Sequence, residues 1–353
     1  MTRQSFQDSR HQDISGLHQT TSNKQNSAFA MQLRTFIGLL VLATALPYFA
    51  VPLLNLAPNV TTLAELLVFI EFAGGGAHVA AGYYFFLEKK GRSILLAHWP
   101  RTILVPLCMA LVYGIVFMKG TPALKAAALL FYFIWQTWHY QRQNFGVSSF
   151  MMRAAQQPPL TRKERLPMQM AVIAAILALV KLYNLGNGLM PSPVVQAIWL
   201  AATCLQAIAI LTALAVAFSI RRQQGAARRS TVMILGTLFF LPSFLYANPI
   251  NAVLSYALAH GLQYLVFMGY IGDRQERRLS SWARLIVLTL ALGGLLIVMQ
   301  ARNGQPVQEF VFGVYLSIIM THFVMDGIIW RLRLAPQRAY MGRIFSFVFA
   351  RTT

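Results

Sequence analysis

The stretch Tyr315–Arg333, YLSIIMTHFVMDGIIWRLR, combines the apolar length of a membrane span with two ionisable groups near its middle. These groups are His322 and Asp326, which are four residues apart and therefore lie on one face of a helix. Ionisable side chains inside a span are costly and usually face the interior of a bundle, where they bind ligands, relay protons or hold a metal. The stretch predicts a membrane protein in which other spans supply partners for these two residues.

The composition of the whole chain agrees with this prediction. Of its 353 residues, 57% are hydrophobic and 11% are charged, whereas a soluble domain would carry about 25% charged residues. The apolar residues occur in runs of about 20, as expected for an all-α, polytopic membrane bundle of about ten transmembrane helices. The predicted apolar segments are 33–54, 62–87, 101–118, 123–143, 167–187, 192–220, 230–247, 250–271, 281–300 and 307–330.

Three regions follow from this pattern. Residues 1–32 are polar and rich in Gln, Ser, Thr and Asn, which predicts a disordered cytoplasmic tail. Residues 33–333 form a single transmembrane domain. Residues 334–353 form a second cytoplasmic tail, in which Tyr340–Phe349 mixes Arg with Phe and is compatible with an interfacial helix or with a disordered end.

The basic residues are distributed unevenly between the two predicted sides of the membrane. Of the 30 Lys and Arg residues, 26 fall in the tails and in alternate connections, and the opposite connections hold only Lys119, Lys125 and Arg302. Because basic residues favour the cytoplasmic side, both termini are predicted to be cytoplasmic, in a multi-pass protein of a bacterial inner membrane. The net charge of +20 is thereby explained by topology and contact with the lipid bilayer, and nucleic-acid binding is not expected.

Four histidines lie within the predicted spans, at His78, His139, His260 and His322. Their spans are all even-numbered, so all run from outside to cytoplasm, and each histidine lies at or beyond the middle of its span. Four imidazoles at one depth could surround a buried metal in the cytoplasmic half of the membrane. Any one of them alone could instead make an interhelical hydrogen bond. His98, in a basic connection, is expected to be interfacial.

A second polar layer lies within about one turn of three of these histidines. Its members are Gln136 and Gln143 near His139, Gln263 and Tyr264 after His260, and Asp326 after His322. Such groups could accept an imidazole N–H and fix its tautomer, or could contact a substrate. Asp326 and Tyr264 are therefore candidate catalytic residues, and the three glutamines are candidates for a supporting role.

The span that carries His78 differs from the others. Glu71 lies seven residues before His78, on the same face and about 10 Å further out. It is a third candidate catalytic residue, for a second metal, a proton route or substrate orientation. Alternatively it is a buried carboxylate paired with a donor such as a Tyr or Lys181. Gly74–Gly76 would let another backbone approach closely.

Imidazole donors without thiolates suit iron, copper or zinc. The sequence favours a membrane-embedded non-haem iron enzyme of the oxygenase, hydroxylase or desaturase type, acting on a lipid or an isoprenoid such as a carotenoid, with an external electron donor. As architecture, this resembles the polytopic bacterial enzymes that cleave β-carotene with a histidine-ligated iron, although their motifs do not align here. The compact histidine boxes of membrane desaturases are missing.

Other function classes are compatible with the same residues. The pairs His78/His139 and His260/His322 could each hold a haem. Glu71, the histidines and Asp326 could form the proton relay of a transporter, and a structural scaffold is a further alternative. Clustering of all four rings would favour a non-haem site, and two separated pairs would favour haem.

Overall fold

The structure is a computed structural model that describes residues 31–51, 68, 71–184, 190–275, 278–300 and 304–349, with the side chain of residue 183 excepted. These residues form helices and their connections, with no β-strand among them. The predicted disordered tail, 1–32, lies outside the described residues except at Met31 and Gln32, which begin a helix.

Seven helices within the described ranges are long and apolar enough to cross a membrane. They are the helix Met31–Ala50, η3 with α6 (Pro100–Lys119), most of α8 (Arg162–Asn184), α9 (Ser192–Ile220), α12 (Pro249–Asp273), α13 (Arg278–Met299) and α14 (Pro306–Ile329). Each has at least 20 residues, which matches the thickness of the hydrocarbon core. The chain therefore has the all-helical construction of an integral membrane protein.

Three of the ten predicted segments differ from these seven helices. Segment 62–87 lies partly outside the described residues and continues as η2 (Phe72–Gly76), α3 (Ala77–Gly82) and α4 (Tyr84–Leu87). Segment 123–143 belongs to α7 (Pro122–Ala154), whose 33 residues have the length of a span but a more polar sequence. The remaining helices are α5 (Lys89–Leu96), α10 (Ala226–Leu238), α11 (Pro242–Leu245), α15 (Ala335–Ile344) and α16 (Ser346–Phe349).

The predicted span over 230–247 is not one continuous helix. α10 ends at Leu238, and the chain turns before α11 begins at Pro242. Pro242 has no N–H to donate to the carbonyl of Leu238, which instead accepts from the backbone N–H of Leu241 at 2.9 Å in a tighter turn. With 13 residues, α10 reaches about 20 Å, which is shorter than the hydrocarbon core.

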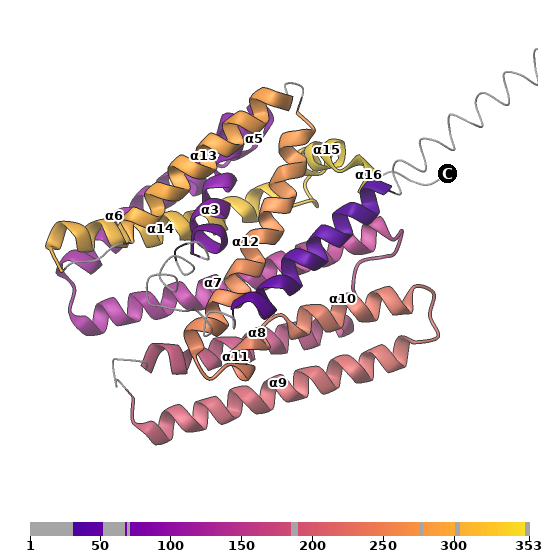
Figure 1. The fold of residues 1–353 in the computed structure, drawn as a ribbon, viewed down its shortest axis with the longest axis horizontal. Helices are drawn as coiled ribbons and strands as arrows, with labels where there is room; N and C mark the ends of the chain where they lie inside the picture. Colours follow the sequence, from indigo (N-terminus) through magenta and orange to yellow (C-terminus); the bar gives the residue numbers. More distant parts are fainter. Residues whose placement is uncertain are drawn as a thin grey trace, which may run out of the picture.

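The helices form two groups that meet along α7 and α12 (Figure 1). α8, α9 and α10 pack against one another as a layer on one side, while α6 packs along α14, and α13 along α3, on the other. α12 and α14 are interior helices, because 61% of the most apolar stretch of each helix is buried, against 22% for α9. The interior helices are the ones that carry polar residues in their middle.

Contacts at both ends show that α7, α12 and α14 run in the same direction. Lys125 and Glu309, near the starts of α7 and α14, form an ion pair at 3.6 Å. Near their ends, the Phe150 ring lies 6.2 Å from that of Trp330 and 5.3 Å from that of Phe267 in α12. The parallel course predicted for these histidine-bearing helices agrees with this packing.

Close backbone contacts hold the short helix α3 inside the bundle. A Cβ atom added to Gly74 would lie 2.9 Å from the backbone nitrogen of Leu258 in α12, and one added to Gly76 would lie 2.7 Å from the Gly293 carbonyl in α13. At Gly75 a Cβ would meet nothing within 4 Å. Two of the three glycines predicted to allow close approach therefore do so, and they do so immediately before His78.

The C-terminal segment packs against the bundle as two helices, α15 and α16. Phe345 and Phe347 are buried, and the Phe345 ring lies within 6.4 Å of the rings of Phe150, Phe267 and Trp330. The part of the predicted tail that the structure describes is thus joined to the core of the helical domain.

A buried ion pair links α8 to α10. The Arg229 guanidinium donates to both oxygens of Glu164, at 2.6 and 2.5 Å, and to the carbonyls of Pro158 and Pro159. The backbone N–H and hydroxyl of Thr161 also donate to Glu164, each at 2.7 Å. Every charged group in this contact therefore has several polar partners.

Candidate metal centre

Four edge-to-face contacts between imidazole rings define the centre of the bundle. His78 of α3 lies 4.8 Å from His260 of α12 and 5.1 Å from His322 of α14, measured between ring centroids. His139 of α7 lies 5.0 Å from His260 and 5.7 Å from His322. The four rings thus form a closed square in the order His78, His260, His139, His322, and the structure brings together all four histidines that the sequence singled out.

The four rings are buried, and most of their nitrogens have no hydrogen-bond partner. The exposed fractions are 0% for His260 and His322, 2% for His78 and 6% for His139. Seven of the eight ring nitrogens make no hydrogen bond with the described residues; the Gly74 carbonyl approaches His78 without meeting hydrogen-bond geometry. Because buried polar groups are normally paired, these nitrogens have the character of unused donor atoms for a ligand.

One carboxylate completes the centre. The hydroxyl of Tyr264 donates to Oδ1 of Asp326 at 2.9 Å. The other carboxylate oxygen, Oδ2, lies 3.3 Å from Nε2 of His322 and 3.7 Å from Nε2 of His139. Tyr264 therefore orients the carboxylate so that its second oxygen faces two imidazoles, and two of the three predicted catalytic residues, Asp326 and Tyr264, are in the centre.

The possible ligand atoms form two groups in which the atoms lie close enough together to bind one metal ion. In the first, one nitrogen each of His78, His260 and His322 lies within 4.8 Å of the others. In the second, donor atoms of His139, His322 and Asp326 meet the same limit. Both groups can hold a metal ion by ligand type and spacing.

Three further residues, which no sequence pattern predicted, also shape the centre. Phe323 stacks on His139 with ring centroids 4.1 Å apart, and Tyr140 lies 4.3 Å from His260. A Cβ at Gly82 would lie 2.5 Å from Nδ1 of His322, so only glycine fits there. Phe323 and Tyr140 directly follow histidines, and Gly82 lies one turn after His78. These spacings along single helices do not predict which residues of other helices will be contacted.

The glutamines predicted to support the imidazoles bind other groups. Gln143 donates to the carbonyl of His260 and to the side chain of Gln263, both at 3.1 Å. Gln263 donates in turn to Thr44 at 2.7 Å, and Gln136 lies near the hydroxyl of Tyr140. The expected bond from an imidazole to Gln143 or Gln263 is therefore absent among the described residues. Gln143 thus joins α7 to α12, and Gln263 joins α12 to the helix Met31–Ala50.

Glu71 lies in a different polar contact. Its carboxylate accepts a hydrogen bond from Gln300, whose carbonyl oxygen accepts one from Tyr315 at 3.0 Å. The two metal-binding groups of the described chain do not include it. The alternative in which Glu71 is paired with an interhelical donor fits this arrangement, with an amide as that donor.

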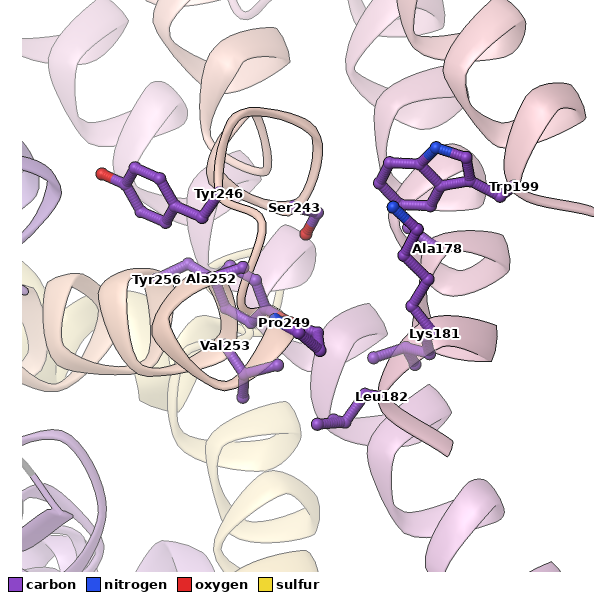
Figure 2. Close-up of a pocket in the computed structure, with 11 residues that line it drawn as sticks. Ala178, Lys181, Leu182, Trp199, Ser243, Tyr246, Pro249, Ala252, Val253 and Tyr256 are labelled. Carbon is purple, nitrogen blue, oxygen red and sulfur yellow. The ribbon is translucent and has the colours of Figure 1, made fainter. Parts of the chain in front are cut away.

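Lys181, the other donor considered for Glu71, lies in a separate pocket between α8, α9 and α12 (Figure 2). Its ammonium group lies 3.3 Å from the centroid of the Trp199 ring, as in a cation–π contact. The pocket contains none of the four histidines. His98, in the connection before η3, is also outside both metal-binding groups, as expected.

Comparison with protein families, curated proteins and solved structures finds no match to this chain. The interpretation of the centre therefore depends on its geometry and chemistry.

Proposed function

We propose that the chain is a membrane-embedded, histidine-ligated non-haem iron enzyme that acts on a lipid-soluble substrate. The observation that carries this proposal is the convergence of four buried imidazoles, of whose eight nitrogens seven make no hydrogen bond with the described residues. Such an arrangement is costly in an apolar bundle unless a ligand uses the nitrogens. A metal ion is the ligand that four imidazoles and one carboxylate suit best.

The donor set favours iron, copper or zinc over magnesium or calcium, because nitrogen donors outnumber oxygen donors. We assign iron(II) as the metal, because nitrogen and carboxylate donors without thiolate are typical of non-haem iron enzymes. When bound, iron would supply the activation of dioxygen needed by an oxygenase, hydroxylase or desaturase. His78, His139, His260, His322 and Asp326 would supply the ligands. Tyr264 would orient the carboxylate through the hydrogen bond to Oδ1.

The substrate class follows from the surroundings of the centre. The helices around it are apolar, and the ring of Phe323 lies against His139. We propose that a lipid or an isoprenoid such as a carotenoid enters from the bilayer. Burial of the centre would limit the access of water, and electrons would come from an external donor protein.

Haem binding is less well supported by the same geometry. His78 and His139 occupy opposite corners of the square of rings, as do His260 and His322. A haem held by either pair would need the space that the other pair fills. A proton relay is also less well supported, because Glu71 is bonded to Gln300 and lies outside the histidine groups.

For the orientation, we propose cytoplasmic termini, a bacterial inner membrane and a centre in the cytoplasmic half of the bilayer. The concentration of Lys and Arg in the tails and alternate connections supports this proposal. Protease accessibility of a tag placed at each end, measured in inverted and right-side-out vesicles, would test it.

Metal analysis and an optical spectrum of the detergent-purified protein test the proposed function. We expect bound iron without a Soret band, and a lower iron content in His322→Ala and in His260→Ala. His98→Ala is the matched control and should keep its iron. A strong Soret band would contradict the proposal in favour of haem, and loss of metal from His98→Ala would show that the site is misassigned.

A further inference from the structure

We infer that the centre holds two metal ions, one in each donor group, with His322 shared between them. The first position consists of His78, His260 and His322, and the second of His139, His322 and Asp326. The inference rests on the proposed metal-binding function and adds a second metal site to it.

The grouping of the donor atoms argues against a single ion. The ligand atoms of one ion with bonds of about 2.1 Å lie at most about 4.2 Å from one another. The five donors of this centre do not form one compact set; they separate into two sets of three, each within 4.8 Å. One ion could gather either set with small side-chain movements, and the two sets share only His322.

The second position is built around one carboxylate oxygen. Oδ2 of Asp326 lies between Nε2 of His322 at 3.3 Å and Nε2 of His139 at 3.7 Å. Tyr264 holds the opposite oxygen, Oδ1, so the orientation of Oδ2 is fixed. Nε2 of His322 is thus the nitrogen assigned to the second position.

The other nitrogen of His322 faces the helix of the first position. Nδ1 of His322 packs against Gly82 of α3, and His78 lies one turn earlier on the same helix. An imidazole can hold one ion at each nitrogen only after its remaining ring proton has left, and binding of the second ion would release that proton to the solvent. We therefore assign Nδ1 of His322 to the first position and Nε2 to the second.

The two positions differ in charge. The first has three imidazoles and no carboxylate, whereas the second has two imidazoles and one carboxylate. A negatively charged ligand strengthens the binding of a divalent cation. The second position should consequently fill first when a metal-free sample is titrated.

Counting bound ions in the full-length protein tests this inference. The metal-free protein in detergent would be equilibrated with Co²⁺, and the bound metal measured after dialysis. We expect two ions in the wild type, one in His78→Ala, one in His139→Ala, and none in the double variant. His98→Ala should keep two, and His322→Ala should weaken both positions.

The outcomes separate this inference from the proposed function. The two-metal inference would be overturned if the wild type bound one ion and both His78→Ala and His139→Ala lowered the affinity for that ion. A single metal centre would then remain. No bound metal in the wild type would overturn both. His78→Gln and His139→Gln provide variants of similar size if an alanine variant fails to fold, and the same loss of one ion is expected from each.

Discussion

The histidine centre and the Glu164–Arg229 pair are both buried polar sites in an apolar bundle, yet they differ in how completely they are satisfied. Arg229 donates to Glu164 and to two proline carbonyls, and Glu164 also accepts two hydrogen bonds from Thr161. The four imidazoles contact one another, but seven of their nitrogens have no hydrogen bond within the described chain.

This difference is the one we expect between a polar site that supports the fold and the metal site that we propose. A buried ion pair with complete hydrogen bonding is stable without any other molecule, although replacing it with apolar residues can be neutral. Buried polar groups without partners cost free energy and persist where function requires them. Variants in the two sites should therefore affect stability in opposite directions.

The largest expected effect is at the ion pair. Arg229→Met would leave the Glu164 carboxylate buried without its cation, and we expect the free energy of unfolding to fall by about 3–5 kcal/mol. Thermal unfolding in detergent measures this loss. Metal content, measured on the folded fraction, should not change, because the pair lies outside both metal-binding groups of the described chain.

Arg228→Met is the matched control for this variant. Arg228 precedes Arg229 in α10 but is exposed, so its replacement should change the free energy of unfolding by no more than about 0.5 kcal/mol. Equal melting temperatures for the two variants would contradict the structural role given to the pair.

A smaller effect of opposite sign is expected in the histidine centre. In metal-free protein, His260→Leu removes two buried nitrogens without partners and replaces the ring with a side chain of similar size. We expect the free energy of unfolding to rise by about 1–3 kcal/mol. Added iron(II) should stabilise the wild type more than the variant, which keeps only the position formed by His139, His322 and Asp326.

Melting temperatures with and without metal measure this prediction, with His98→Leu as the control that should respond to metal as the wild type does. A large loss of stability in metal-free His260→Leu would mean that His260 belongs to a satisfied network. In that case the histidine centre would resemble the Glu164–Arg229 pair, and the comparison would fail.

Much of the fold could be predicted from the sequence because hydrocarbon imposes a simple pattern. Runs of about 20 apolar residues identify the seven long helices with small errors at their ends. The pattern is less informative where a helix is interior and polar, as in α7, or where a proline interrupts an apolar run, as at Pro242. Pro242 indicates a break in the helix, whereas the high mean hydropathy of 230–247 favours one continuous span.

The site was predicted less evenly than the fold. The depth of the four histidines follows from their place along each helix, since every residue adds about 1.5 Å. The direction of a side chain depends on rotation about the helix axis, and each residue turns by about 100°. Gln143, which is bonded to the His260 carbonyl rather than to an imidazole, shows how spacing along one helix leaves the partner on another undetermined.

The ion pair was not predicted, for a related reason. Glu164 and Arg229 are 65 residues apart and lie near the starts of α8 and α10. Charged residues at helix ends in a basic connection are expected to face the cytoplasm, where they are solvated. Only the folding of residues 158–161 over Arg229 makes this position a buried one.

The smallest expected effect is at Tyr264, where the histidine centre contains one satisfied contact of its own. Tyr264→Phe removes the donor to Oδ1 of Asp326, so the carboxylate can rotate, and metal affinity should fall about tenfold, or ~1.4 kcal/mol. The number of ions bound at saturation should not change. Tyr256→Phe, which alters a buried tyrosine two turns earlier in α12, should leave the Kd measured by metal titration unchanged. If both variants bind metal as the wild type does, Asp326 and Tyr264 form a self-sufficient polar contact like that of Glu164 and Arg229, and the ligands would be histidines alone.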